Sequence, residues 1–404
     1  MPAANPTVDA TAATLTVTSM TLDSLMQPAI RHRYETFLAG LANDSGLLYY
    51  APPYLAMLAD LFEASAQLQV LVAERGNTIT GCLPLMVCDG PLGKVINALP
   101  FFGSHGGLLT DDMDTARVLA GAWHDTLDTI EPVAATMITN PFCPLDLAPL
   151  RDTLPIDATD ERIAQFIDLT DWGDGNVWAH MDVDRFAEKL GDTARRNVRK
   201  AFKSGVTVAV DNSAEALAFL RHTHTTTMAD QGGTVKPAAF FDGLTRWFEP
   251  HTHYNIYVAR QDGQRVAALL VFYWHRTMEY FVPVTLPDAR NSQPMAAILY
   301  AALKDAGMRG MTRFNWGGTW LSQTGVYQFK KKWNTNESRY FYWTSLHPGH
   351  ARTLKTQTPQ ALIDAYPYWY VLPFNLLALP DTADMPDTLP HPPIGGEDTG
   401  STPR

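Results

Sequence analysis

The chain has 404 residues, of which 46% are hydrophobic and 18% charged, and its formal net charge is -11. This length predicts two or three domains with sizeable cores. The acidic balance argues against general coating of nucleic acid, which requires a broad cationic face, but it leaves a local basic groove open. Three cysteines are too few and too poorly spaced for a zinc site or a disulfide framework.

The N-terminal residues 1–13 are small and polar and predict a flexible arm without the features of a signal peptide. The longest apolar run, Val266–Trp274, is much shorter than the ~20 residues that span a bilayer. We therefore expect a soluble, cytoplasmic protein with no integral membrane segment.

The first part of the chain alternates helical and strand patterns. Residues 51–65 have apolar side chains at helical spacing, and 68–90 predict two strands joined by a Gly-Asn turn. A glycine-rich turn follows in 98–110, then a helix in 116–130 and a strand in 134–139. The link to the next part is expected near 155–180.

The second part repeats this order. It has a helix in 213–231, a hairpin with an Asp-Gly turn in 253–285, a helix in 294–308 and a strand in 312–318. Pro294 suits the first turn of the helix that it opens, and Gly307 suits its end. We predict an α/β fold with two similar domains, 14–160 and 161–350. A C-terminal extension, 351–404, is rich in proline and polar residues and is expected to be disordered from about 372.

A basic helix is predicted at the start of the second domain, in "DTARRNVRKAFKSGV" (192–206). Asp192 or Thr193 can cap it, and Gly205 can end it. Its cationic side chains contain no acid among them and are candidates for binding phosphates or carboxylates: Arg195, Arg196, Arg199 and Lys203. The alternative is a solvated surface helix whose charges pair with acids elsewhere.

Three segments together resemble the Fem-type aminoacyltransferases and their FemAB-like relatives. They are "TARRNVRKAFKSGV" (193–206), the turn "LPFFGSHGGLL" (99–109) and "FNWGGTWLSQTGVYQFKKKWN" (314–334). The resemblance covers roughly residues 45–345. It implies two tandem domains of the Gcn5-related N-acyltransferase (GNAT) fold, each a twisted mixed sheet flanked by helices. It also implies transfer of an acyl or aminoacyl group to an amine.

The resemblance places Phe329 and Lys330 beside the centre of acyl transfer. Lys330 is then a candidate to stabilise the tetrahedral oxyanion or to meet donor phosphates, and His105, in the glycine turn, is a candidate base. The aromatic side chains can stack on the adenosine of the donor, and the paired glycines allow a ligand close to the backbone. The donor-binding residues expected on these grounds are Trp316, Gly317, Gly318, Tyr327, Ser292 and Gln293.

The donor expected from the resemblance is aminoacyl-tRNA or acyl-CoA, with no tightly bound cofactor and no metal. CoA-using relatives carry a glycine-containing loop where this chain reads "DARNSQPMAAIL" (288–299), so aminoacyl-tRNA is mildly favoured. The acceptor would be an amine on a small molecule or on a cell-envelope or exopolysaccharide precursor, the latter at the periphery of the inner membrane. Two alternatives stay open. One is an acetyl-CoA-dependent N-acetyltransferase of a sugar or small amine, and the other is a non-catalytic protein that binds glycan or peptide precursors.

Overall fold

The computed structural model describes residues 14–99, 105–173, 175–230 and 233–377. Within these ranges the strands form a single mixed sheet of twelve: β1 (Leu15–Thr21), β2 (Ala66–Arg75), β3 (Thr78–Gly90), β4 (Gly93–Asn97), β5 (Ala134–Ile138), β6 (Ala158–Asp168), β7 (Thr207–Val210), β8 (Tyr254–Gln261), β9 (Gln264–Trp274), β10 (Thr277–Thr285), β11 (Arg313–Trp320) and β12 (Asn336–Leu346).

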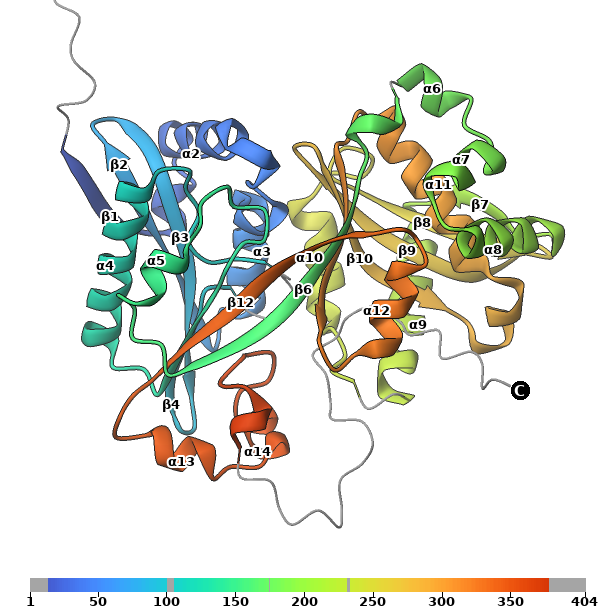
Figure 1. Ribbon diagram of the computed structural model, residues 1–404. Helices are drawn as coiled ribbons and strands as arrows, with labels where there is room; N and C mark the ends of the chain where they lie inside the picture. The colour runs from blue at the N-terminus through green and yellow to red at the C-terminus, as the bar shows by residue number, and fades with distance from the viewer. Residues whose placement is uncertain (1–13, 100–104, 174, 231–232, 378–404) are drawn as a thin grey trace, which may run out of the picture.

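Helices cover both faces of this sheet (Figure 1). The longer ones are α2 (Pro28–Gly40), α3 (Pro52–Leu61), α4 (Met113–Ile130), α8 (Asp192–Lys203), α9 (Ala214–Asp230), α10 (Ala238–Trp247) and α11 (Pro294–Met308). The shorter ones are α1 (Leu22–Leu25), α5 (Ala148–Arg151), α6 (Gly175–Ala179), α7 (Val183–Lys189), α12 (Thr324–Lys331), α13 (Ala351–Lys355) and α14 (Pro359–Ala365), with 3-10 turns η2 (Ala42–Asp44), η3 (Leu48–Tyr50), η4 (Thr170–Trp172), η5 (Pro287–Ser292) and η6 (Phe374–Leu376).

The strand order divides the sheet into two halves of six strands, β1-β2-β3-β4-β5-β12 and β6-β11-β10-β9-β8-β7. We call them the first half and the second half. β12 pairs with β5 on one side and with β6 on the other, so the last strand in the chain completes the first half. Figure 1 shows β6 and β12 running side by side across the middle of the molecule, from one half to the other.

Each half contains the same core motif. In this motif an antiparallel hairpin is followed by a further strand, a helix and a strand that pairs in parallel. In the first half, α4 connects β4 to its parallel neighbour β5. In the second half, α11 connects β10 to its parallel neighbour β11. This arrangement confirms the predicted fold class: two α/β units, each a mixed sheet flanked by helices.

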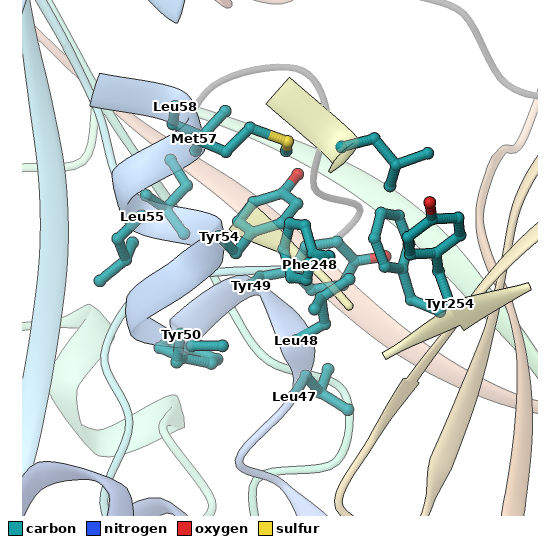
Figure 2. Close-up of a cluster of buried hydrophobic side chains, with 14 of the residues drawn as sticks. Leu47, Leu48, Tyr49, Tyr50, Tyr54, Leu55, Met57, Leu58, Phe248 and Tyr254 are labelled. Carbon is teal, nitrogen blue, oxygen red and sulfur yellow. The ribbon is translucent and has the colours of Figure 1, made fainter. Parts of the chain in front are cut away.

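One hydrophobic core belongs to both halves. Its buried side chains include Leu55 and Met57 of α3 and also Phe240 and Leu244 of α10. Because buried apolar area stabilises by about 25 cal/mol per Å², this shared core fixes one half against the other. Figure 2 shows Tyr49 and Tyr54 of the first half gathered with Phe248 and Tyr254 of the second.

The structure corrects several sequence-based expectations. Residues 155–180, expected as a link, contain β6, which lies in the middle of the sheet. The helix α8 is capped by Gly191, without a side-chain hydrogen bond, and not by Asp192 or Thr193. Disorder from about 372 is wrong for 372–377, since Leu372 and Leu377 are buried against β4 and α14 in one apolar cluster.

Two expected segments, the arm at 1–13 and the tail from 378 on, lie outside the described residues. The predicted domain limits, 14–160 and 161–350, stay a prediction. Among the helices that the structure describes, none combines the length and the hydropathy needed to cross a membrane.

Candidate functional site

The two parallel strands of the second half separate after a short contact. β10 and β11 are paired only where Thr277, Met278 and Glu279 face Arg313, Phe314 and Asn315. β10 has an irregular register with β9 immediately afterwards, between Tyr280 and Val282. Because paired strands keep one spacing, this early end of the ladder leaves room between β10 and the helix α12 that follows β11.

A cavity of about 230 Å³ lies beside the separated part of β10. Its walls come from β10, from the beginnings of α11 and α8, and from the end of α12. The lining residues are Thr193, Ala194, Asn197, Thr227, Tyr280, Pro283, Val284, Thr285, Arg290, Gln293, Pro294, Met295, Ala296, Phe329, Lys332 and Trp333. Phe329 and Gln293, two of the candidate site residues named from the sequence, are among these lining residues.

The cavity combines positive charge with aromatic rings. Arg290 and Lys332 supply the cations, and Phe329 and Trp333 supply rings. The N-terminus of α11 also opens here, and the amides of a helix N-terminus favour an anion. These groups suit a ligand that has an anionic part and a flat ring or an apolar chain.

Two prolines reduce the backbone donors of the cavity. Pro283 lies on β10 and Pro294 is the first residue of α11, and proline has no N–H. Gln293, just before α11, has a left-handed backbone with φ 57° and its side-chain amide donates to the carbonyl of Arg290. Ser292 does the same to the carbonyl of Ala289 at 2.8 Å. The hydroxyl of Ser292, a predicted donor-binding residue, therefore donates its hydrogen bond within its own turn.

Lys330 is buried, and its ammonium lies against the backbone of β11. Its Nζ donates to the carbonyls of Gly317 and Gly318 at 3.4 and 3.0 Å and to the hydroxyl of Thr319 at 2.8 Å. Burial lowers the pKa of Lys330 to about 7. A direct role for Lys330 toward an oxyanion requires release of one of these three bonds. Phe329, by contrast, lines the cavity.

A chain of hydrogen bonds continues from Lys330 to the first half. The backbone N–H of Gly317 donates to Asn315 Oδ1 at 3.0 Å, and Asn315 Nδ2 donates to Glu279 Oε2 at 2.9 Å. The hydroxyl of Tyr49, in η3 of the first half, donates to the same Oε2 at 3.1 Å. The path connects the glycine–lysine motif to a carboxyl group between the halves.

Glu279 is the central residue of this path. Burial raises its pKa to about 7, while the hydrogen bonds from Asn315 and Tyr49 and the charge of Arg313 act in the opposite direction. Its Oε1 has no hydrogen-bond partner among the residues that the structure describes. Consecutive strand residues point to opposite faces, so Glu279 faces the first half while Tyr280 faces the cavity.

His105 lies close to this path. It is buried, and its ring makes edge contacts with Tyr49, Phe142 and Tyr340 at centroid distances of 6.1, 5.7 and 4.8 Å. The structure therefore brings His105 next to Tyr49, the residue that binds Glu279.

The predicted aromatic residues are distributed differently from the expectation. Trp316 is buried in the core of the second half against Tyr280, Phe329 and Trp333. Tyr327 donates to Glu337, outside the cavity. The rings on the cavity wall are Phe329 and Trp333. Gly317 has φ +75°, and a Cβ on Gly318 would overlap the hydroxyl of Tyr340, so both glycines serve the packing of β11.

The basic helix α8 meets the cavity with its neutral side chains. Thr193, Ala194 and Asn197 line the cavity. Arg195 pairs with Asp192 at 2.8 Å and Arg199 pairs with Asp184, while Arg196 donates to Thr193. Lys203 is exposed and is the last residue of α8. Phosphate binding by these four cations stays a prediction.

The sequence analysis did not single out Arg290, Lys332, Asn315 or Tyr49. Lys332 belongs to the same lysine run as Lys330, and its helical offset from Phe329 would have placed it on the same face of α12. Tyr49 has no such signal, because 230 residues separate it from Glu279. The described residues hold no group of His, Cys, Asp and Glu side chains that fits a metal ion.

Comparison with known proteins agrees with this geometry. Residues 189–331 match the family model described as "Acetyltransferase (GNAT) domain". No curated protein matches the sequence.

Among solved structures, that of FemX is similar with a TM-score of 0.61 at 12% identity, covering 84% of this chain and 99% of that one. The structure of L-PGS from Bacillus licheniformis is similar with a TM-score of 0.50 at 13% identity, covering 83% and 96%. A protein of unknown function from Bacteroides thetaiotaomicron gives 0.50 at 12% identity, covering 82% and 100%. At these identities the likeness concerns the fold, and it extends over both halves. Residues 189–331 thus match a GNAT acetyltransferase domain, and the chain as a whole has a two-half fold similar to that of FemX.

Proposed function

We propose that the protein is an N-acyltransferase that takes an acyl or aminoacyl group from an activated donor in the cavity and delivers it to an amine. The observation that carries this proposal is the separation of β10 from β11 beside a cavity with Arg290, Lys332 and the N-terminus of α11. Positioning of the two reactants and stabilisation of the developing negative charge would supply most of the acceleration.

Lys330 acts in this proposal as a positioning residue. Its three hydrogen bonds hold the separated edge of β11 and so keep the cavity open on the α12 side. No cofactor is retained, and the acceptor is an amine on a cell-envelope or exopolysaccharide precursor.

For the donor we favour aminoacyl-tRNA. An extended amide chain, such as the pantetheine arm of CoA, would bind the free edge of β10 through backbone hydrogen bonds, and Pro283 removes one donor from that edge. The match of residues 189–331 to an acetyltransferase domain supports acetyl-CoA as the second candidate.

The test is transfer itself, measured by mass spectrometry after incubation with aminoacyl-tRNA or acetyl-CoA and a set of amine-bearing envelope precursors. Met295→Trp should fill the cavity and abolish product formation with little change in melting temperature. Met308→Trp is the matched control, since Met308 lies at the other end of α11 and is 46% exposed. Equal loss of product in both variants would contradict a donor in this cavity.

Calorimetry separates the two donors, because only an acyl-CoA-dependent enzyme should give heat with acetyl-CoA. A protein that binds precursors without forming any product from either donor would support a binding role instead.

A further inference from the structure

Another cavity lies in the first half, and we call it the α2 groove. Its volume is about 630 Å³, within the roughly 300–1,000 Å³ that is usual for small-molecule sites. Its walls come from α2, which packs against β3 (Figure 1), from the end of the β2–β3 hairpin and from the segment that precedes α4. The described residues that line it share no member with those of the cavity beside β10, so the two spaces are separate.

The α2 wall of this groove leaves room for a ligand. His32, Thr36 and Gly40 follow one another at four-residue spacing and so lie on one face of the helix. The hydroxyl of Thr36 donates back to the carbonyl of His32 at 2.8 Å, and a Cβ on Gly40 would point into open space. Phe37, beside them on the same wall, supplies an apolar surface. The wall therefore combines open space with a place for an apolar side chain.

Arg75, at the end of β2, supplies a cation to the groove. Its guanidinium makes no hydrogen bond with the described residues, and its contact with Asp112 Oδ2 is 3.7 Å long, beyond hydrogen-bond distance. That oxygen already accepts the backbone N–H and the hydroxyl of Thr115 at 2.9 and 2.6 Å, as the cap of α4. Arg33, by contrast, is held by Glu74 at 2.5 Å. Arg75 therefore keeps its N–H donors for a group that enters the groove.

The segment before α4 places carboxylates next to this cation. Asp111 is exposed and lines the groove, and neither a hydrogen bond nor an ion pair joins its side chain to any residue that the structure describes. Asp112 keeps a negative charge, because the hydrogen bonds from Thr115 lower the pKa of its carboxyl. These two carboxylates disfavour a phosphate, while Arg33 and Arg75 disfavour a simple cation. The groove therefore suits a ligand that carries a carboxylate and an N–H group close together.

We propose that the α2 groove is a binding site for an α-amino carboxylate, either a free amino acid or the carboxyl end of a peptide. Its carboxylate pairs with the guanidinium of Arg75, whose planar donors match the two oxygens, and its N–H donates to Asp111. Its side chain packs against Phe37. This site is separate from the cavity beside β10, and the inference does not depend on the proposed function.

The position of the groove suits a peptide that extends toward the second half. The carbonyl of Asn43 accepts a hydrogen bond from Arg313 at 2.9 Å, and the carboxylate of Asp44 accepts one from Thr312 at 2.6 Å. These contacts join the first half to the start of β11. Because a residue spans at most about 3.6 Å, Asp44 lies within roughly 14 Å of Gly40 on the groove wall. The groove therefore lies next to the contact between the halves.

The experiment measures dissociation constants by saturation-transfer NMR with the full chain and two probes, L-alanine and N-acetyl-L-alanyl-L-alanine. We expect the wild type to bind at least one of them, and to bind L-alaninamide, which lacks the carboxylate, at least tenfold more weakly. Tighter binding of L-alanine identifies a free amino acid as the ligand. Tighter binding of the N-acetylated dipeptide identifies the carboxyl end of a peptide.

Substitution of the groove cation gives the main variant. Arg75→Gln should weaken binding of the tighter probe at least tenfold, because the paired carboxylate loses its counter-charge. Arg117→Gln is the matched control, since Arg117 pairs with Asp114 on the exposed side of α4, outside the groove. This control should bind the probe as the wild type does.

Two further variants test the other walls. Thr36→Trp fills the groove from an exposed position of α2 and should abolish binding with little change in melting temperature. Asp111→Asn should weaken binding at least threefold. Absence of binding by the wild type, or unchanged binding in Arg75→Gln and Thr36→Trp, would overturn the inference. No acyl donor is present in this experiment, so its result is independent of whether acyl transfer is found.

Discussion

The two halves of the sheet have the same plan but differ where their parallel strands end. In the second half, β10 and β11 pair over three residues and then enclose a cavity. In the first half, β4 and β5 also pair over three residues, from Val95 with Ala134 to Asn97 with Thr136. Glu279 and Asn97 therefore have the same position, the last paired residue of their strands.

Gly106 and Gly107 occupy the corresponding space in the first half. A Cβ on Gly106 would lie 2.6 Å from the carbonyl oxygen of Ala98, and one on Gly107 would overlap the carbonyl oxygen of Ile138. Gly106 and Gly107 thus lie between the ends of β4 and β5. Asn97 in turn exchanges two hydrogen bonds with the backbone of Tyr370 from the C-terminal segment.

In the described part of the first half, the place that corresponds to the cavity is therefore filled by the backbone of Gly106 and Gly107. The carbonyl of Ile138 touches a glycine, whereas its counterpart, the carbonyl of Gly317, binds Lys330. We conclude that the first half supports the second and contributes Tyr49 and Tyr54 to the contact between them, with His105 packed against Tyr49.

The largest expected effect is a loss of stability on substitution of Gly107, which fills the space between β4 and β5 in the first half. Gly107→Val should prevent folding or cost more than about 4 kcal/mol, since Gly107 has φ +76° and its Cβ would collide with backbone. Denaturant unfolding measures the change. Gly121→Ala, on the open side of α4 with nothing within 4 Å, is the control and should be neutral or slightly stabilising. A fully stable Gly107→Val would show that the space is not filled.

The second prediction concerns Lys330. Its pKa is lowered from 10.5 to about 7, so the folded state binds this proton less tightly than the unfolded state. The free energy of unfolding should therefore rise between pH 7 and pH 10.5 by up to roughly 5 kcal/mol, at 1.36 kcal/mol per pKa unit. Lys330→Met should remove this rise, and Lys331→Met, at an exposed lysine, should keep it. Parallel curves for wild type and Lys330→Met would contradict the burial of the ammonium.

Glu279 should give a slope of the opposite sign. Its pKa is raised from 4.5 to about 7, so the folded state holds the proton more tightly. Stability from this group is complete below pH 4.5 and is lost as the pH rises to 7, by up to roughly 3 kcal/mol. Glu279→Gln should flatten the curve over this range, as measured by chemical denaturation at several pH values.

The titratable or charged neighbours of Glu279 are Tyr49, Tyr54 and Arg313, with His105 against Tyr49. Asn97 is the neutral counterpart of Glu279 in the first half. The substitution Asn97→Asp is the opposite change, and it should make the free energy of unfolding depend on pH through this position. An unchanged slope in Glu279→Gln would assign the titration to one of the neighbours.

The smallest expected effects concern the cations of the cavity. Arg290→Gln and Lys332→Gln should each weaken the binding of inorganic pyrophosphate about tenfold, or ~1.4 kcal/mol, as measured by calorimetry. Lys331→Gln should have no effect, because Lys331 pairs with Glu337. Equal affinity in all three variants would place the anion elsewhere, with α8 as the next candidate.

Local patterns were sufficient to predict much of the fold. The spacing of apolar residues, with a proline at the start and a glycine near the end, predicted α11 over 294–308. The Asp-Gly pair predicted the turn between β8 and β9, where Asp262 and Gly263 both have positive φ. These features depend on short-range physics, which a sequence displays directly.

Long-range pairing was not predictable in the same way. The pairing of β12 with β5 and the contact of Tyr49 with Glu279 join segments that are about 200 residues apart, and no periodicity records such partners. The choice between Lys330 and Lys332 on the cavity wall depends on how α12 is rotated against β11. The sequence favoured Lys330, whereas the packing of Trp333 and Phe329 places Lys332 on the cavity wall and buries Lys330.

The position of β12 has a consequence for biosynthesis. During translation β5 and β6 emerge long before Asn336–Leu346, so each presents an unpaired edge until this segment has left the ribosome. Open edges favour wrong pairing between nascent chains. Chains interrupted before residue 336 should therefore aggregate even though the complete sequence of β1–β5 is present, and neither half should be obtainable as an independent fragment.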